Sequence, residues 1–411
     1  MRMLLVHNYY GSSAPSGENQ VFEAERAMLE RHGMEVDVFM RHSDEIRLVV
    51  GGWWLVNGLR KVWGLLKGAV CTVANPFAAM ALKKKIREFS PDVVHFHNTF
   101  PLISPLAIRT AKKSKVKVVV TLHNYRMVCA AGIPMRRSRV CDTCFRKVKV
   151  KGEGERRKLA VISALRNRCY RGSLLATVPL VLNVWLYRKR WAKWVDKFIA
   201  LSEFQRQVMI ECGLPAEKIV VKGNFIQSNN LNNPSNRTMR SGVVFVGRLS
   251  DEKGVKTLLK AWRIFERHEQ SNTPNNRTVL TLIGDGDQRA EYEKLANGLK
   301  VRFLGKLPHD EALKELSLAR LLVMPSEWWE TFGLVLVEAA MCETPAVVSD
   351  LGALPEIVTK LGIGRVFRAG NEEGLAKKIQ DAMKEDANAL KFNTNEFSEE
   401  MNFNRLMEIY K

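Results

Sequence analysis

Runs of aliphatic and β-branched residues recur along the whole chain, separated by segments of helix length. They predict strands at residues 3–6, 35–39, 93–96, 116–121, 197–200, 219–222, 242–246, 279–283, 301–304, 320–324 and 345–348. The runs are almost continuously apolar rather than alternating, which is typical of strands buried on both faces of a parallel sheet. Strands that alternate with helices in this way predict an α/β fold.

One polar stretch divides this pattern in two. Residues 227–241 are rich in Asn and Ser and hold few large apolar residues, which is typical of a linker. The 411 residues also exceed what one open sheet usually contains. We therefore predict two tandem, doubly wound, Rossmann-like domains at residues 1–226 and 242–390. Residues 127–195 are predicted to form a basic, cysteine-containing insertion in the first domain.

The positive charge of the chain is confined to its first half. The formal net charge is +21, and residues 1–225 hold 39 Lys and Arg against 17 Asp and Glu, a net of +22. The remainder is therefore close to neutral. An anionic partner, such as a membrane surface, a lipid phosphate or a nucleic acid, is expected to bind the first half. The composition, 46% hydrophobic and 26% charged, excludes a disordered or collagen-like chain.

The chain offers no apolar run long enough to span a membrane, and residues 1–10 do not resemble a secretory signal. We expect a cytoplasmic protein. Residues 46–70 and 171–194 combine Trp with Arg and Lys beside apolar positions, which favours peripheral contact with the anionic inner leaflet of a membrane. The alternative is that both segments are amphipathic helices packed on the sheet.

The first strand of the second half ends in a motif suited to phosphate. Gly247 and Arg248 follow the strand, and Lys253 precedes the next helix. A glycine permits close backbone approach, a helix N-terminus attracts anions, and the two cations strengthen that attraction. The motif predicts a diphosphate site, with a solvated loop as the alternative. Residues 284–286, Gly284, Asp285 and Gly286, form a second strand-to-glycine turn, which is a plain turn or part of the same site.

Two glutamates enclose the third motif. Glu330 and Glu338 lie eight residues apart, about two helical turns, so both are expected to face one cleft. A carboxylate accepts two hydrogen bonds at once, which suits a sugar or ribose diol. The alternative is that Glu330 caps a helix and Glu338 lies on its solvated side. The apolar neighbours of Glu338 favour the first interpretation.

These motifs, in this order and together with the Thr331, Phe332, Gly333 and Leu334 segment, resemble the donor domain of glycosyltransferase family 4. The resemblance implies retaining enzymes of the GT-B fold, with a catalytic cleft between the domains. It implies that Gly247, Arg248 and Lys253 bind the diphosphate of a nucleotide-sugar, UDP- or GDP-linked, with the base near residues 284–286. It also implies that Glu338 binds the ribose, while Glu330 and residues 331–334 contact the donor sugar. Residues 391–411 are then expected to end in a helix that packs back on the first domain.

In the first half, the resemblance points to residues around the acceptor. Gly17 and Glu18 resemble the Gly-Gly-x-Glu element of the family, although Ser16 replaces its first glycine. His97 and His123 each follow a buried apolar run, so their side chains are expected at the cleft edge. The family match gives His123 a catalytic role beside the donor sugar, with His97 behind it.

Four cysteines, Cys129, Cys141, Cys144 and Cys169, fall within 41 residues. The Cys-x-x-Cys spacing and two further thiols are compatible with a structural zinc ion. The alternative is a set of independent thiols. No catalytic metal or other cofactor is expected, because Arg248, Lys253 and a helix N-terminus can offset the charge of the leaving diphosphate.

The sequence thus predicts a retaining glycosyltransferase that acts on a lipid-linked or other glycan acceptor, with a bacterial surface polysaccharide as the expected product. One alternative is a nucleotide-sugar epimerase of related fold, which would act on the donor alone. Another is a zinc-knuckle protein that binds nucleic acid. A nucleic-acid-binding function would leave the sugar-site residues of the near-neutral second half unexplained, so we expect no nucleic-acid partner. The base, the sugar, the linkage and the oligomeric state are not readable from the sequence.

Overall fold

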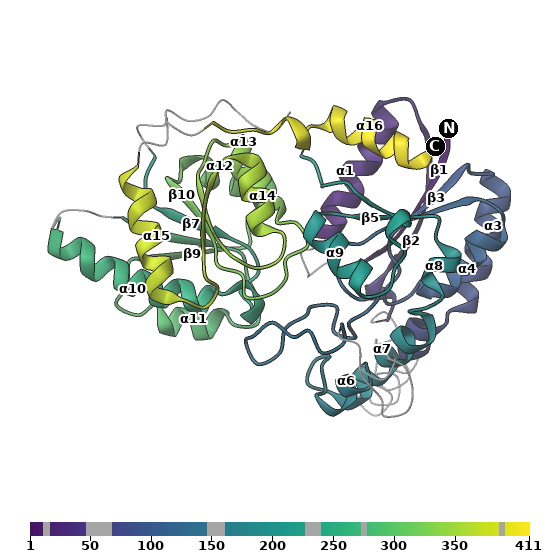
Figure 1. Cartoon of the computed structure of the whole chain (residues 1–411), viewed down its shortest axis with the longest axis horizontal. Coiled ribbons are helices and arrows are strands. Elements are labelled where there is room, and N and C mark those ends of the chain that lie inside the picture. The colour runs from purple at the N-terminus through teal and green to yellow at the C-terminus, as the bar shows by residue number, and fades with distance from the viewer. Residues whose placement is uncertain (11–16, 47–67, 146–160, 227–239, 273–277, 386–390) are drawn as a thin grey trace, which may run out of the picture. The chain divides into compact units, whose positions relative to one another are not determined.

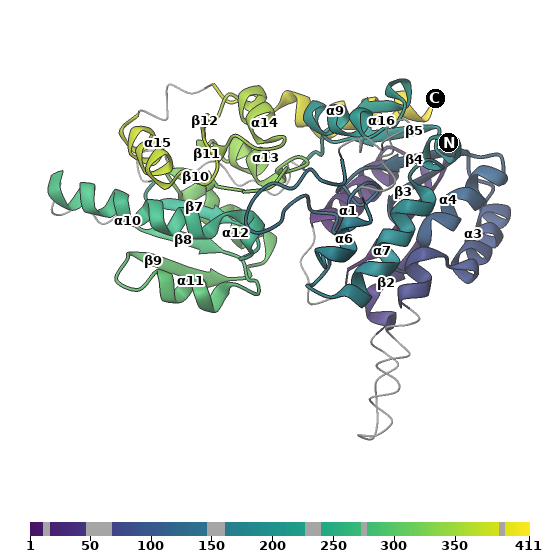
Figure 2. The same ribbon diagram turned by 60° about the horizontal axis from the view of Figure 1, so that its bottom comes forward.

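The apolar runs of the sequence become the strands of two parallel, six-stranded sheets with helices around them (Figures 1 and 2). The computed structural model describes residues 1–10, 17–46, 68–145, 161–226, 240–272, 278–385 and 391–411. It divides into two units, each with one sheet. Unit 1 comprises Met1–Pro134, Cys141–Gly223 and Asn402–Lys411, and unit 2 comprises Met135–Val140 and Asn224–Met401.

The sheet of unit 1 has the strand order β2-β1-β3-β4-β5-β6. Its strands are β1 (Arg2–Tyr9), β2 (Glu35–His42), β3 (Val93–Asn98), β4 (Lys117–Thr121), β5 (Lys197–Ala200) and β6 (Ile219–Val221). Its helices are α1 (Gly17–Arg31), α3 (Pro76–Phe89), α4 (Ser104–Lys113), α6 (Ser163–Arg166), α7 (Leu174–Tyr187), α8 (Trp191–Trp194), α9 (Glu203–Glu211) and the greater part of α16 (Glu399–Tyr410), with short 3-10 turns η1 (Ser43–Ile46) and η2 (Ala216–Lys218).

The order of these strands fixes where a ligand can bind in unit 1. The chain moves from β1 to β2 on one side, and then crosses to β3 and continues on the other side. Because such crossovers are right-handed, α1 lies on one face of the sheet, and α3 and α4 lie on the opposite face. The carboxyl ends of β1 and β3 therefore form a topological switch point, where open α/β sheets bind ligands.

Unit 2 has the strand order β12-β11-β10-β7-β8-β9, with its switch point between β7 and β10. Its strands are β7 (Val243–Val246), β8 (Leu280–Ile283), β9 (Val301–Gly305), β10 (Leu321–Met324), β11 (Ala346–Ser349) and β12 (Gly364–Phe367). Its helices are α10 (Val255–Asn272), α11 (Arg289–Leu295), α12 (His309–Leu318), α13 (Leu334–Met341), α14 (Leu354–Leu361) and α15 (Glu372–Lys384), with η5 (Asp251–Lys253) and η7 (Asn395–Phe397). Trp262 and Phe265 of α10 stack in the core, with ring centroids 4.8 Å apart.

The predicted α/β fold with two doubly wound sheets is confirmed, and every predicted strand is present. One further strand, β12, was not predicted. Its segment from Gly364 to Phe367 holds only two apolar residues. Glycine is required there because a Cβ at position 364 would lie 1.8 Å from the carbonyl oxygen of Ala346 on the neighbouring strand. Close packing against the neighbouring strand thus requires a glycine in place of an apolar residue, which weakens the apolar run that would have predicted β12.

Parts of three sequence-based predictions lie outside the described residues: 227–239 of the linker, 47–67 of the first membrane segment and 146–160 of the insertion. In the remaining part of the insertion, Ser173 caps the N-terminus of α7, with its hydroxyl 3.3 Å from the backbone nitrogen of Ala176. Among the helices that the structure describes, none has the length and apolar character needed to cross a membrane.

Candidate functional site

Two predicted histidines meet at the carboxyl ends of β3 and β4. Nδ1 of His97 lies 3.1 Å from Nε2 of His123, and the two rings stack with their centroids 5.3 Å apart. Both side chains are buried. Burial lowers the pKa of His123 well below its usual range, and the neighbouring His97 lowers it further. His123 is therefore a neutral imidazole at physiological pH, able to donate one hydrogen bond and accept another.

A buried carboxylate that was not among the predicted site residues, Glu25, contacts His95 and His97. Oε1 of Glu25, from α1, lies 3.0 Å from Nδ1 of His95 and 3.1 Å from Nε2 of His97. Its other oxygen lies 3.1 Å from Nζ of Lys222, just after β6. Although burial alone would raise the pKa of Glu25, Lys222 and the two histidines hold it well below its usual range. Glu25 is therefore ionised.

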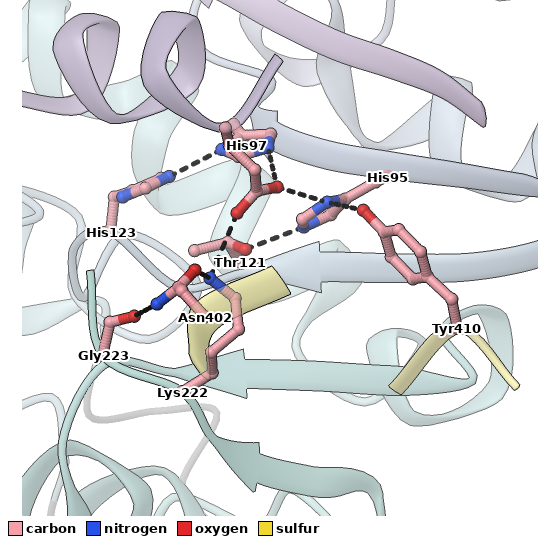
Figure 3. Close-up of polar contacts among 9 residues, drawn as sticks. His95, His97, Thr121, His123, Lys222, Gly223, Asn402 and Tyr410 are labelled. Atoms are coloured by element: carbon pink, nitrogen blue, oxygen red, sulfur yellow. Dashed lines mark hydrogen bonds and ion pairs between the residues drawn. The ribbon is translucent and has the colours of Figure 1, made fainter. Parts of the chain in front are cut away.

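The C-terminal helix α16 completes this buried cluster (Figure 3). Asn402 accepts a hydrogen bond from Lys222 at 2.7 Å and donates one to the carbonyl oxygen of Gly223, also at 2.7 Å. The Tyr410 hydroxyl lies 2.7 Å from Nδ1 of His95, whose Nε2 lies 2.8 Å from Oγ1 of Thr121. Segments from both ends of the chain thus hold the histidines in place.

The sequence did carry a signal for Glu25. The buried residues of α1 are Val21, Phe22, Glu25, Met28 and Leu29, which lie on one stripe of the helix. A charged residue on an apolar stripe is rarely buried without a partner. Its partners, however, lie as many as 197 residues away along the chain, at Lys222, so no local pattern could identify them.

A pocket opens beside His123 in unit 1. Polar side chains at its wall include His97, Asn98, His123, Asn124 and Arg126, and Leu180 and Asn183 of α7 line another part. The Arg126 guanidinium stacks on the Phe100 ring at 4.0 Å from its centroid. Its Nε and Nη1 atoms are buried and have no hydrogen-bond partner among the described residues. The stacked guanidinium is thus fixed in place and still able to bind an anion.

The Gly17 and Glu18 element lies at the start of α1. Gly17 is the first residue of this helix, and the preceding residues 11–16, which include Ser16, are outside the described chain. Glu18 accepts a hydrogen bond from Asn124 at 2.8 Å. The carboxylate therefore anchors the loop that carries His123, in contact with a neighbour of the predicted catalytic residue.

In unit 2, the predicted glycines let two turns pack backbone to backbone. A Cβ on Gly284 would lie 1.9 Å from the carbonyl oxygen of Gly247, and a Cβ on Gly286 would lie 2.4 Å from that of Leu249. The exposed Asp285 side chain accepts a hydrogen bond from the backbone nitrogen of Gly286 at 2.8 Å. The turn after β8 thus has a packing role against the turn after β7, whatever it binds.

The unit 2 switch point brings Lys253 and Glu330 together. Nζ of Lys253 lies 2.6 Å from Oε1 of Glu330, and the Ser326 hydroxyl donates to the same oxygen at 2.8 Å. Burial would raise the pKa of Glu330, but Lys253 and the hydrogen bonds hold it below its usual value. Arg248 is half-exposed and pairs with Glu252 at 2.8 Å. Both predicted diphosphate-binding cations are therefore present at one sheet edge.

The helical spacing argument for the two glutamates was wrong. Helix α13 begins only at Leu334, after Gly333, whose left-handed backbone (φ 91°) ends the preceding loop. Glu330 lies in that loop, so the two carboxylates are not two turns apart on one helix. Glu338 is buried in α13, and burial raises its pKa to about 7. Thr331 and Phe332 are also buried in the loop.

Comparison with known proteins identifies the family. Residues 17–229, more than half of the chain, match the model of Glycosyltransferase Family 4, and residues 227–398 match Glycosyl transferases group 1. The chain belongs to glycosyltransferase family 4. A crystal structure of Anabaena HepE in complex with UDP and glucose has the same fold as this family 4 chain, with a TM-score of 0.60 and 17% identity over 99% of this chain and 98% of that one.

Curated relatives of the family 4 chain match over shorter segments. An uncharacterised glycosyltransferase of Methanocaldococcus jannaschii is 39% identical over 28% of this chain and 29% of its own length. An uncharacterised 42.6 kDa protein in the cps region of Klebsiella pneumoniae is 24% identical over 66% of this chain and 61% of its own length. The match thus spans less than two thirds of either relative.

The four cysteines of the insertion are neighbours in unit 1. Burial, together with the neighbouring Cys169 and Cys141, raises the pKa of Cys129 to about 11. Burial and the other three thiols likewise raise the pKa of Cys144. No three of these four described sulphur atoms lie within 4.8 Å of one another, whereas tetrahedral zinc needs sulphurs about 3.8 Å apart. Structural zinc at these cysteines stays a prediction. Measuring the zinc content of the purified protein tests it.

The raised pKa of Glu338 predicts how the stability of the family 4 chain depends on pH. The unfolded carboxyl has a pKa of about 4.3, whereas the folded one titrates at about 7. Between these values the folded state holds a proton that the unfolded state has lost. Stability should therefore fall as the pH rises from about 4.5 to about 7, by about 4 kcal/mol at most.

Replacing Glu338 by Gln removes this titration. We expect the stability of Glu338→Gln relative to the wild type to increase as the pH rises from 5 to 8, measured by urea denaturation at a series of pH values. Glu311→Gln, at an exposed position of α12, serves as the control. Parallel stability curves for the wild type and Glu338→Gln would contradict the assignment.

Proposed function

We propose that this chain transfers a sugar, with retention of configuration, from a nucleotide diphosphate-sugar to a hydroxyl of a lipid-linked saccharide. The pathway we propose is the synthesis of a bacterial surface polysaccharide. Membership of glycosyltransferase family 4 supports sugar transfer, and the relative in the Klebsiella cps region supports the pathway. The observation that carries the proposal is the Lys253–Glu330 pair at the unit 2 switch point.

This pair suits a donor that carries both charge and hydroxyl groups. The Lys253 ammonium can bind a diphosphate oxygen, and Arg248 can supply a second cation. The Glu330 carboxylate, held ionised by Lys253, can accept hydrogen bonds from hydroxyl groups of the sugar. Glu338, with a pKa of about 7, can accept from one ribose hydroxyl and, when protonated, donate to the other. The solved complex of HepE with UDP and glucose is consistent with such a donor.

The proposed transfer takes place on one face of the sugar. The acceptor oxygen forms a bond to the anomeric carbon as the bond from that carbon to the diphosphate oxygen breaks. The diphosphate takes the bonding electrons and accepts the proton of the attacking hydroxyl. Cations at the diphosphate stabilise the charge that develops there, so the residues Arg248 and Lys253 are catalytic by electrostatics. His123 contributes a neutral imidazole that contacts the sugar.

The pocket of unit 1 supports an acceptor that bears a phosphate group. Arg126 offers two buried guanidinium nitrogens that have no hydrogen-bond partner within the described part of the chain, next to His123 and Asn124 in the pocket wall. A guanidinium binds phosphate through parallel hydrogen bonds. A lipid diphosphate that carries the growing saccharide has this chemistry. Its glycan end would then extend along the side of the pocket where His123 lies.

Helix α7 supports a lipid acceptor independently, because it lines the same pocket and also presents an apolar outer face. Its buried face includes Leu180, Val181 and Val184. The exposed apolar side chains of this helix are Leu174, Leu175, Val178, Leu182 and Trp185. Exposed basic residues flank the helix at Arg171, Lys189 and Arg190. An apolar face between cations favours an anionic membrane surface, from which a lipid-linked acceptor could enter the pocket.

The first prediction from the proposed function tests the donor site. Lys253→Ala should weaken the binding of UDP or GDP by roughly 10-fold to 100-fold, the effect of losing one charge-assisted hydrogen bond. Calorimetric titration measures this affinity. Lys256→Ala is the matched control, since Lys256 lies on α10 with its side chain 55% exposed. Equal affinities in Lys253→Ala and the control would refute the donor assignment, and turnover of a nucleotide-sugar without any acceptor would favour an epimerase.

The second prediction concerns the acceptor pocket. Arg126→Gln should raise the KM for a polyprenyl-diphosphate-linked saccharide by roughly tenfold or more, while the KM for the nucleotide-sugar stays unchanged. Arg109→Gln, at an exposed position of α4, is the control. The proposed role of Arg126 fails if a water-soluble acceptor without phosphate loses the same activity in Arg126→Gln.

The third prediction concerns the membrane. The double variant Leu175→Glu with Leu182→Glu should reduce sedimentation with phosphatidylglycerol vesicles by at least about tenfold in partition coefficient, because two exposed leucines that would insert into the membrane are lost. Phe77→Glu, which alters a side chain 75% exposed on α3, is the control. Binding that is equally strong in the double variant would mean that α7 is not the membrane-facing element.

A further inference from the structure

The cluster around Glu25 is connected to the sugar-facing histidine through one intervening ring. From the Lys222 ammonium, polar contacts run to Glu25, then to His97 and finally to His123 (Figure 3). Each distance along this chain is 3.1 Å. Glu25 and Lys222 are almost fully buried, as is the His97 side chain. The contacts between them are therefore insulated from water.

We propose that Glu25 and His97 are positioning residues that fix the tautomer and orientation of His123. An ionised carboxylate can only accept, so Nε2 of His97 carries the proton that faces Glu25. In a neutral ring, Nδ1 of His97 is then an acceptor, and it accepts from Nε2–H of His123. His123 is thereby left with an acceptor nitrogen at Nδ1. This inference rests on the proposed function, in which His123 contacts the donor sugar.

The His123 tautomer with an acceptor at Nδ1 is suited to binding a sugar hydroxyl. A sugar hydroxyl that donates to Nδ1 of His123 would be held in one orientation, whereas the other tautomer would present a second donor and repel it. The same logic orients histidines at metal and protease sites, where a carboxylate sets which ring nitrogen carries the proton. Here the carboxylate acts through a second imidazole, and no proton is transferred along the chain.

The contact between Glu25 and His97 is close, although its alignment departs from ideal hydrogen-bond geometry. Oε1 of Glu25 and Nε2 of His97 are both buried and lack a hydrogen bond of standard angle among the described residues. Such contacts in ligand-free sites commonly align only when substrate binds. We therefore expect the Glu25–His97 contact to align when a donor sugar engages His123.

A divalent cation is the competing explanation for the same atoms. Glu25, His95 and His97 offer three ligand atoms within 4.8 Å of one another. However, Nζ of Lys222 lies 3.1 Å from the second carboxylate oxygen and already balances its charge. The Tyr410 hydroxyl also lies 2.7 Å from Nδ1 of His95. A cation would have to share the carboxylate with an ammonium group in a buried cluster, so the contacts favour the positioning role.

The test measures the His123 tautomer directly. In the wild type, imidazole ¹⁵N resonances, assigned with His123→Asn, should show His123 protonated at Nε2 and unprotonated at Nδ1. The double variant Glu25→Gln with Lys222→Met removes both charges and so leaves no unpaired buried ion. It should give a mixture of tautomers. Glu30→Gln is the control on the same helix, where Glu30 pairs with Arg26 at the surface.

Kinetics supply the second readout. The double variant should lower kcat for sugar transfer by roughly 10-fold to 100-fold, comparable with losing the partner that orients a metal-bound histidine. The KM for the nucleotide-sugar should stay within about twofold, because the donor binds unit 2. A wild-type tautomer and wild-type kcat in a folded double variant would overturn the proposal. So would a stoichiometric divalent metal in the wild type that the double variant lacks.

The two proposals fail in different ways. If the wild type transfers no sugar from any nucleotide-sugar, the proposed function is wrong, while the ¹⁵N spectra still report whether Glu25 controls His123. If transfer occurs but the tautomer does not respond to Glu25, only the positioning proposal is wrong.

Discussion

The burial of one negative charge organises unit 1. A carboxylate removed from water must be paired and hydrogen-bonded, or it takes up a proton. Glu25 meets this requirement with Lys222, which Asn402 in turn holds. Because these groups come from α1, the end of β6 and α16, the carboxylate can be satisfied only when distant parts of the chain are assembled. The C-terminal helix is thus part of the site and not an appendage.

Unit 2 also pairs a buried carboxylate with a lysine, but there the lysine remains partly exposed to solvent. Glu330 is buried and paired with Lys253 at the switch point between β7 and β10, as Glu25 is paired with Lys222 in unit 1. Lys222, however, is fully enclosed, whereas the Lys253 side chain is 19% exposed. An enclosed lysine can only balance charge. A partly exposed one can also bind an anion, so the two pairs differ in function through the solvent access of their cations.

The sequence predicts what local pattern determines. Buried parallel strands are continuous apolar runs, so most of them could be read directly from the sequence. Strand β12 was missed because Gly364, which close packing requires, and Arg365 leave it only two apolar residues. The spacing of the glycines and cations after β7 can be recognised in the sequence without any knowledge of the tertiary structure. The helix argument for Glu330 failed because Gly333, in a left-handed conformation, starts α13 later than the apolar pattern suggests. Glu25 was missed because its burial as an ion depends on Lys222, which lies 197 residues away in the sequence.

The buried charges also explain why His95 is neutral. Burial and the neighbouring His97 lower the pKa of His95 to about 4, although Glu25 opposes both effects. Because Lys222 already neutralises Glu25, a protonated histidine would be an uncompensated cation in the cluster. A neutral imidazole has one donor and one acceptor nitrogen. In the proposed arrangement, the His97 proton that faces Glu25 therefore fixes the direction of the hydrogen bond between His97 and His123. In the proposed site, the buried Lys222–Glu25 pair therefore also sets which hydrogen bond the His123 imidazole can accept.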